Sequence, residues 1–328
     1  MTIDDIAREL NISKTTVSRA ISGKGRIGTK TREKVLKYIN ENNYRPNALA
    51  KGLAQSRTFN IGFVMPEDYN LTELSFFQNC MWGISSKASE LDYDVIISMV
   101  TENNISRLER LVDNQKVDGI ILGRTLENDP AVEYLKNAGI PFVAIGAAED
   151  KSVPQIDNDH LAGSSELTSL LLKEGIRKLA LIGGSMRHIV NQNRLKGYED
   201  AFKKNKIAID DSVIYTDTCS KIRIEEAVRD LLLKKAECIL CMDDAICIHV
   251  LNTLENEAVR VPRDIKVASF YNSRMLEKHQ PAITSLQFDA MELGAASCRL
   301  LADCIEKREA ANQTLLGYQL VINESTKF

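Results

Sequence analysis

The chain has 328 residues, a length that suits two or three folded units, and its composition, 44% hydrophobic and 27% charged, is typical of a soluble globular protein. No apolar run approaches the roughly 20 residues that span a bilayer, so we expect no membrane segment. The first residues, MTIDDIAREL, carry acids where a secretory signal carries basic residues, so we expect a cytoplasmic protein.

Seven cysteines, an odd number, fit a reducing compartment. Cys238 and Cys241 form a CxxC pair inside the apolar run AECILCMDD, where burial in a core is the simpler interpretation and metal or redox use is the alternative. Because no second CxxC or HxxxH accompanies the pair, we expect no metal site and no cofactor.

Charge is divided unevenly along the chain. Residues 1–57 hold 12 Lys/Arg and 5 Asp/Glu, a net charge of +7, whereas the remainder holds 30 and 40, a net of −10. A compact basic head favours binding to the phosphates of nucleic acid, because each neutralised phosphate releases counterions. A solvated basic surface is the alternative that charge alone leaves open.

The head predicts three short helices. Thr2 and Asp5 match a capping box before a first helix that ends near residue 11, and Ser13 can cap a second helix over 14–21. After the loop SGKGRIG, Thr29 can cap a third. We expect an inner face made of Ile3, Ile6, Ala7, Leu10, Val17, Ala20, Ile21, Val35, Leu36 and Ile39. Two short helices joined by a brief turn form a helix-turn-helix, although any small three-helix bundle would share this pattern.

The outer face of the second helix carries DNA-reading chemistry. Arg19 can present two parallel donors to guanine, Lys14 can reach the same acceptors, and Thr15 offers a hydroxyl and a methyl group to base edges. The small hydroxyls of Thr16 and Ser18 suit phosphate contacts, which position a helix without reading sequence.

The segment TIDDIARELNISKTTVSRAISGKGRIGTKTREKVLKYINENNYRPNALAKGLAQSRT resembles the head of the LacI/GalR family of bacterial transcription regulators almost position for position. The resemblance implies a helix-turn-helix domain over 1–45, with Lys14, Thr15 and Arg19 at base-reading positions. It places the remaining DNA contacts, to the backbone, at Thr2, Ser13, Thr16, Ser18, Tyr44 and Asn47.

Residues 46–58 match the hinge helix of that family. Leu49 and Leu53 have helical spacing, but about eight residues with an internal glycine are too few for a helix that is stable alone in water. The resemblance implies that this helix orders on DNA and that Leu53 wedges into a minor-groove step. A plain tether is the alternative.

From residue 60 onward, apolar strands alternate with amphipathic helices, which is the pattern of parallel sheets covered by helices. Eight strands are expected, at NIGFVM, DVIISM, DGIILG, PFVAI, KLALIGG, SVIYT, ECILC and IKVASF. The resemblance implies a periplasmic-binding-protein-like α/β body over 59–328 that the chain crosses three times. The first lobe is expected at about 59–157 plus 283–314, and the second at about 158–282 plus 315–328.

Ligands of open α/β sheets bind beyond the carboxyl ends of the strands, which points to residues just after them. The resemblance implies that Arg194, in NRLKGY, binds hydroxyl or carboxylate groups of an effector, with an interlobe salt bridge as the alternative. It also places one or both of Phe76 and Phe77 against the ligand. His188, Asp243 and Asn272 complete the expected set.

Two positions depart from the family pattern. The chain has Asp243-Asp244 where Asn-Asp is common, and Asn272 where an Asp is common, so one carboxylate and one amide are exchanged. Gly146 stands where a second acid often sits. We expect the effector to be a sugar or sugar derivative with an altered hydroxyl pattern.

No phosphate-binding glycine loop or nucleophile elbow follows any strand, so we expect no enzyme activity. Asp157 and Asp159 are expected to organise the crossing between the lobes. Together the patterns predict a homodimeric regulator, most simply a repressor, on a pseudo-palindromic operator in double-stranded DNA, controlled by a small carbohydrate. The alternative is a sugar-binding receptor with no DNA-binding role. Because no leucine heptads follow the last strand, a dimer is expected rather than a tetramer.

Overall fold

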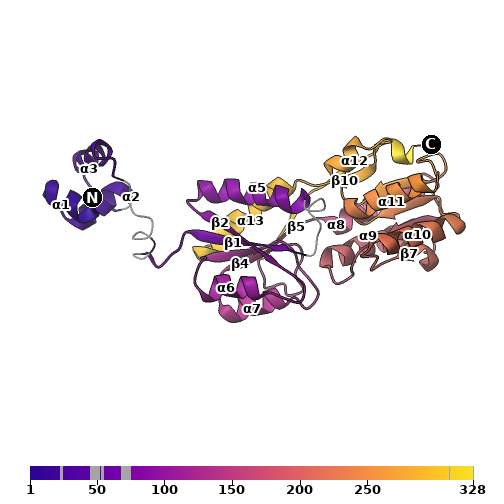
Figure 1. Ribbon diagram of the computed structural model, residues 1–328, viewed down its shortest axis with the longest axis horizontal. Coiled ribbons are helices and arrows are strands. Elements are labelled where there is room, and N and C mark those ends of the chain that lie inside the picture. The colour runs from indigo at the N-terminus through magenta and orange to yellow at the C-terminus, as the bar shows by residue number, and fades with distance from the viewer. Residues whose placement is uncertain (23–24, 45–51, 53–54, 68–74, 310, 328) are drawn as a thin grey trace. The chain divides into compact units, whose positions relative to one another are not determined.

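The computed structural model describes residues 1–22, 25–44, 52, 55–67, 75–309 and 311–327 (Figure 1). The chain divides into two compact units, Met1–Thr58 and Phe59–Phe328, which are described in turn. The DNA contacts predicted at Asn47 and Leu53, and most of the predicted hinge helix, lie outside the described residues.

The head unit consists of α1 (Ile3–Glu9), α2 (Lys14–Ser22) and α3 (Thr29–Glu41). The capping box of α1 is formed in both directions: the amide of Thr2 donates to Asp5 Oδ2 at 2.8 Å, and the amide of Asp5 donates to Thr2 Oγ1 at 3.3 Å. Ser13 caps α2 as predicted, since its Oγ accepts from the amide of Thr16 at 3.1 Å.

Two expectations for α3 were wrong. The residue that caps α3 is Gly28, whose backbone is extended, and Thr29 is already the first helical residue. Leu36 is 37% exposed, because Val35 and Ile39 fix the inner face and the next position turns about 100° away from it. Tyr38 packs against the small core in its place. That core is made of Ile6, Ala7, Leu10, Val17, Ala20, Val35 and Ile39.

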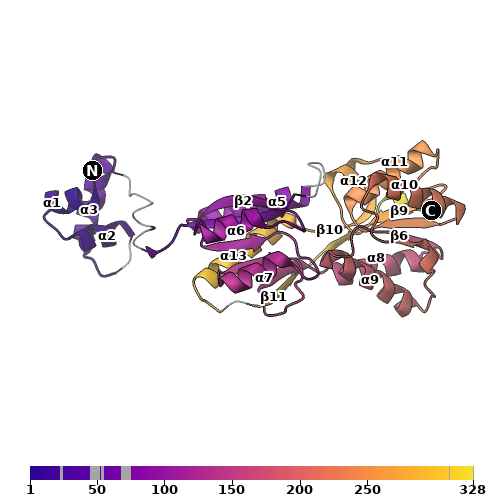
Figure 2. The same ribbon diagram turned by 60° about the horizontal axis from the view of Figure 1, so that its bottom comes forward.

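The body contains two six-stranded sheets, and the predicted fold class is confirmed (Figures 1 and 2). The first has the order β11-β5-β4-β3-β1-β2, and the second has the order β12-β10-β9-β8-β6-β7. All pairings are parallel except that of β10 with β12. The first sheet comprises β1 (Asn60–Pro66), β2 (Asp94–Val100), β3 (Gly119–Leu122), β4 (Phe142–Ile145), β5 (Gln155–Asn158) and β11 (Gln313–Leu316). The second comprises β6 (Leu179–Ile182), β7 (Ile214–Tyr215), β8 (Cys238–Cys241), β9 (Lys266–Ser269), β10 (Thr284–Gln287) and β12 (Gln319–Val321).

Helices cover both sheets. In the first lobe these are α5 (Ser75–Glu90), α6 (Ser106–Asp113), α7 (Pro130–Ala138) and α13 (Ala290–Ile305), and in the second they are α8 (His160–Lys173), α9 (Ile189–Asn205), α10 (Lys221–Leu233), α11 (Asp244–Asn256) and α12 (Arg274–Lys278). Cys238 and Cys241 are fully buried in β8, where burial raises the pKa of both thiols. Among the described helices, none has both the length and the apolar character needed to cross a bilayer.

All eight predicted strands are present, although SVIYT contributes only Ile214–Tyr215 because residues 211–213 form a 3-10 turn. The four unpredicted strands, β5, β10, β11 and β12, flank the three crossings between the lobes. Their positions move two boundaries. Residues 283–287 were expected in the first lobe, but strand β10 belongs to the second sheet. Residues 315 and 316 were expected in the second lobe, but they pair with β5 in the first sheet.

Candidate DNA-reading face and ligand cavity

Helix α2 separates an inner from an outer face. Val17 and Ala20 are fully buried, whereas Lys14, Thr15, Ser18 and Arg19 are exposed. The exposed set follows from helical periodicity, because the buried pair fixes the face that turns inward. The three predicted base-reading residues therefore share one accessible surface.

Arg19 and Lys14 are held by local contacts on that surface. Gly25 has φ of +91°, and a Cβ there would lie 3.2 Å from Arg19 Nε, so the loop lets the guanidinium lie against its backbone. Lys14 forms an ion pair with Asp4 of α1 while its side chain stays 69% exposed. Both cations are available to an approaching phosphate or base.

Five of the six predicted backbone-contacting residues, all but Asn47, lie in the described part of the head. Thr2 and Ser13 cap α1 and α2, and the hydroxyls of Ser13 and Thr16 lie 2.8 Å apart. Tyr44 is partly buried against the head's core. Capping hydroxyls lie at helix N-termini, where the backbone amides and the helix dipole favour an anionic phosphate.

A cavity of about 140 Å³ lies between the two lobes. It is smaller than the roughly 300–1,000 Å³ of typical small-molecule sites, so a larger ligand requires the lobes to separate. Phe76, Phe77, His188, Arg194 and Asp243 line it, as expected. The other residues along its wall are Gly123, Arg124, Thr125, Ile145, Gly146, Asp157, His160, Val190, Asn191, Asp244, Ala245 and Tyr271.

Arg194 is the buried cation of this cavity. Its side chain is 7% exposed, and its Nε has no hydrogen-bond partner within the described parts of the chain. Helix α9 brings it there through Gly197, where a Cβ would lie only 2.0 Å from Ser164 Oγ of α8. Burial lowers the pKa of Arg194, and Asp243 and Asp157 oppose that shift. The alternative of an interlobe salt bridge has no support, since no carboxylate oxygen of the described chain lies within ion-pair distance of it.

Three carboxylates surround this guanidinium. Asp243 caps α11 by accepting from the amide of Ile246 at 2.8 Å. Asp157 accepts from the amides of Ala147 at 3.1 Å and Asn158 at 2.8 Å. Burial, and then the neighbouring Asp243, raise the pKa of Asp244 to about 6.

Asn272 does not line the cavity, contrary to expectation. Its amide nitrogen donates to Glu277 Oε1 at 3.0 Å, and the preceding residue, Tyr271, turns inward instead. The Tyr271 ring meets the edge of Phe76 with 5.9 Å between ring centroids. The amide proposed to replace a carboxylate is therefore absent from the wall, and a phenol occupies its place.

Gly146 also lines the cavity. Its φ is +106°, and a Cβ there would lie 2.8 Å from Thr125 Oγ1, so this backbone accommodates no acidic side chain. Asp157 provides a carboxylate beside it, bonded to the amide of the next residue, Ala147.

Phe76 and Phe77 differ in burial. Phe77 is 7% exposed and belongs to the core of the first lobe, and Phe76 is partly buried against the cores of both lobes. Their rings meet edge-on, with 5.2 Å between centroids. Phe76 thus offers the more accessible apolar surface to a ligand.

Two family models match the chain. Residues 2–47 match the bacterial regulatory proteins of the lacI family, and residues 168–326 match a periplasmic binding protein-like domain. The chain belongs to the LacI family. It is accordingly a transcription regulator with a helix-turn-helix domain, as the resemblance predicted.

Relatives in this family match over the full chain. Identity is 28% over 333 residues to catabolite control protein A of Staphylococcus xylosus, covering 100% of this chain and 99% of that protein. It is 29% over 338 residues to the Staphylococcus aureus protein of the same name, with 100% and 99% coverage. A solved complex of the transcriptional regulator CelR with cellobiose has 26% identity, a TM-score of 0.74 and 99% coverage of both chains. The Lac repressor dimer bound to operator has a TM-score of 0.80 and 99% coverage of both chains, and at 24% identity it supports the fold alone.

The regulator's cavity contains residues that the sequence analysis did not single out as ligand contacts, chiefly Arg124, Thr125, Asp157, His160 and Tyr271. Arg124 and Thr125 follow the predicted strand DGIILG, so the strand-end rule could have found them. His160 begins α8 immediately after a strand that the sequence did not reveal.

Proposed function

We propose that this regulator is a homodimeric repressor that binds a pseudo-palindromic operator and responds to a carbohydrate effector held between its lobes. The DNA-binding part of the proposal is carried by the exposed set Lys14, Thr15 and Arg19 on one face of α2. Two such helices, related by a two-fold axis, would enter successive major grooves about one turn apart. Leu53 is proposed as the minor-groove wedge, on the family resemblance.

The effector part is carried by Arg194, a buried guanidinium whose Nε lacks a partner in the described structure. A buried donor without an acceptor costs about 1–3 kcal/mol, which a ligand hydroxyl or carboxylate would recover. Carboxylates at Asp157, Asp243 and Asp244 supply acceptors for sugar hydroxyls, and Phe76 and Tyr271 supply apolar faces. The complex of CelR with cellobiose makes carbohydrates the first class to test.

Homodimerisation is supported by large apolar side chains left in solvent. Trp82 on α5 is 63% exposed, Met291 on α13 is 53% exposed and Ile97 on the edge strand β2 is 49% exposed. Helices α5 and α13 pack closely at Gly83, where a Cβ would lie 1.9 Å from the carbonyl oxygen of Met291. Burial of such side chains against a second copy would remove an unfavourable surface.

The proposal includes a cytoplasmic location, where the operator is found, and no enzymatic activity. Binding of the promoter region beside its own gene, measured by gel shift with and without candidate sugars, tests it. A specific shift that a sugar weakens or strengthens supports the proposal. Sugar binding without any DNA binding at low salt would favour the receptor alternative instead.

A further inference from the structure

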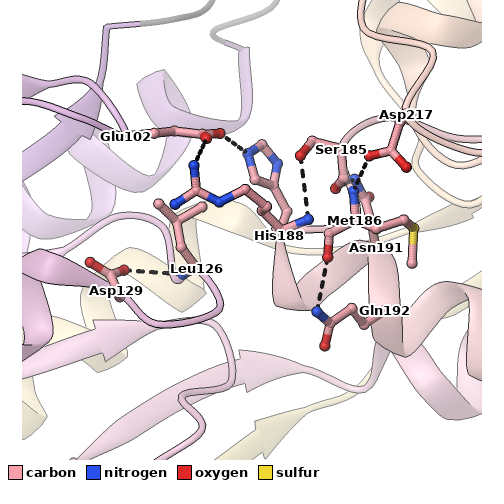
Figure 3. A network of polar contacts seen from close by, with 10 residues as sticks. Glu102, Leu126, Asp129, Ser185, Met186, His188, Asn191, Gln192 and Asp217 are labelled. Carbon is pink, nitrogen blue, oxygen red and sulfur yellow. Dashed lines mark hydrogen bonds and ion pairs between the residues drawn. The ribbon is translucent and has the colours of Figure 1, made fainter.

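The two lobes contact each other beside the cavity through two loop segments, residues 125–127 of the first lobe and 185–189 of the second (Figure 3). Leu126 and His188 form an isolated antiparallel bridge. The amide of Glu127 donates to the carbonyl of Arg187 at 2.8 Å, and the amide of Ile189 donates to that of Thr125 at 3.5 Å. The backbone itself therefore bridges the lobes.

Glu102 adds a charged contact to this bridge. It lies in the turn after β2 of the first lobe, and its carboxylate accepts from Arg187 Nη1 at 2.7 Å and lies 3.0 Å from His188 Nε2 (Figure 3). The Glu102 side chain is 22% exposed and that of His188 is 12% exposed, so both contacts are partly shielded from water. Hydrogen bonds to charged groups in such places contribute more than those between neutral groups.

The second-lobe segment is braced from within its own lobe. The amide of Met186 donates to Asp217 Oδ1, the side chain of Asn191 donates to the carbonyl of Ser185, and that of Gln192 donates to the carbonyl of Met186, each at 2.9 Å (Figure 3). Displacement of Arg187 or His188 is therefore coupled to α9, the helix that also contains Arg194.

The first-lobe segment is braced as well. The amide of Leu126 donates to Asp129 Oδ2 at 3.0 Å, and the amide of Asn128 donates to Glu149 Oε2 at 2.8 Å. Two loops that are each fixed to their own lobe can separate only if the lobes move apart.

We propose that Glu102, Arg187, His188 and residues 125–127 form an interlobe clasp, in which Glu102 is a positioning residue that sets the balance between the closed and open lobe arrangements. Thr125 and His188 line the cavity, so opening the clasp removes two walls of the ligand site at once. A ligand that touches both lobes favours the closed arrangement, and the clasp determines how much of that closure exists before it binds. Glu102 thus tunes effector affinity from outside the cavity.

The charges around His188 make the clasp sensitive to pH. Burial, and then the first-lobe cation Arg124, lower the pKa of His188, whereas Glu102 and Asp243 raise it. Separation of the lobes relieves the burial and removes both Arg124 and Glu102. Because the pKa of His188 is lowered on balance in the closed arrangement, a proton on His188 favours the open arrangement. Closure weakens as the pH falls through the range in which the imidazole titrates.

Hydrogen exchange of the full-length protein, read by mass spectrometry without any effector, tests the clasp. The reporters are the amides of Glu127 and Ile189, which donate between the lobes, in peptides covering 125–129 and 186–190. Glu102→Gln should speed their exchange about five- to tenfold, because a hydrogen bond to a charged group is lost. The matched control is Glu67→Gln, which removes an ion pair with Arg107 of 2.9 Å inside the first lobe and should leave both peptides unchanged.

A pH series separates a clasp from a merely structural contact. After correction for chemical exchange rates, these amides should exchange faster at pH 5.5 than at 7.5, and His188→Gln should remove that dependence. Unchanged exchange in Glu102→Gln, or equal acceleration by the Glu67 control, overturns the proposal. Only the consequence for effector affinity rests on the proposed function, and the measurement needs no effector, so the two can fail separately.

Discussion

His160 Nε2 lies 3.5 Å from Asp157 Oδ1, and the two side chains share a wall of the interlobe cavity. Burial, and then the nearby Arg194, lower the pKa of His160, so its imidazole carries no charge at neutral pH. The ring also packs against Phe288, with 4.7 Å between centroids. Arg194 is therefore the cation that a ligand meets on this side of the cavity, and its removal gives the sharpest test of effector binding.

Arg194→Met should abolish effector binding without lowering stability. A buried guanidinium that lacks full hydrogen bonding costs free energy, and a methionine of similar length removes the charge while keeping the packing. Calorimetric titration with sugars should lose its signal, and the thermal midpoint should stay level or rise. The control Arg229→Met removes an exposed pair with Glu257 and should leave sugar binding intact. Undiminished binding by Arg194→Met contradicts the assignment.

Asp244→Asn should stabilise the protein most at high pH. The folded state raises the pKa of Asp244 from its ordinary 3.8 to about 6, so ionisation opposes folding. Below pH 3.8 Asp244 is protonated in both the folded and the unfolded chain and does not oppose folding. As the pH rises through 6, ionisation of Asp244 lowers the free energy of unfolding, by up to about 3 kcal/mol at pH 7.5. Urea unfolding at pH 5 and 7.5 should show a larger gain for the variant at 7.5. The exposed Asp200→Asn variant should show no such difference, and an equal gain at both pH values would exclude this cause.

Arg19→Lys should reduce operator specificity while keeping the head's net charge. A lysine cannot reproduce the two parallel hydrogen bonds of a guanidinium to guanine, which are worth about 1–3 kcal/mol of discrimination. Fluorescence anisotropy with specific and unrelated DNA should show weaker specific binding and unchanged non-specific binding. The control is Arg8→Lys, which also conserves charge and changes an exposed side chain of α1. Equal loss on both DNAs would assign Arg19 to the phosphates.

Leu53→Ala should weaken specific DNA binding and leave the folds of head and body intact. A leucine inserted between base pairs unstacks them at a cost of a few kcal/mol, which extra contacts to the bent duplex repay. Anisotropy on the operator, with circular dichroism as the folding check, measures the effect. Operator affinity equal to wild type would leave residues 46–58 as a tether.

Trp82→Glu should shift the proposed dimer toward monomer. A charge placed at a buried apolar contact costs about 2 kcal/mol or more, which raises the dissociation constant at least about thirtyfold. Light scattering across a concentration series gives the oligomeric state, and Trp82→Phe should remain dimeric. A chain that is monomeric before any substitution would remove this part of the proposal.

The alternation of apolar strands with helices was enough to predict the fold class and the main strands of both sheets. The strands at the crossings were not predicted, because they are short and partly polar, as in QIDN and TSLQ, and are defined by pairing between distant segments. Local pattern carries no information on such pairing.

The strand-end rule correctly predicted that Asp243 lines the cavity, whereas Arg194, which lies within α9, was indicated by the family resemblance. The prediction for Asn272 was wrong because the sequence does not give the direction of a side chain: Tyr271 faces the cavity, and Asn272 donates a hydrogen bond to Glu277. Glu102 could not be found, because an acid in a turn acquires its role only when the second lobe brings Arg187 beside it.

Effector-dependent binding of the full-length protein to its own promoter is the most direct test. Anisotropy at physiological salt, on promoter and unrelated DNA, should show at least about a thousandfold preference for the promoter. An active sugar should change promoter affinity about five- to 150-fold in wild type and leave it unchanged in Arg194→Met. Equal affinity for both DNAs, or a sugar effect that persists in Arg194→Met, would contradict control of the head through this cavity.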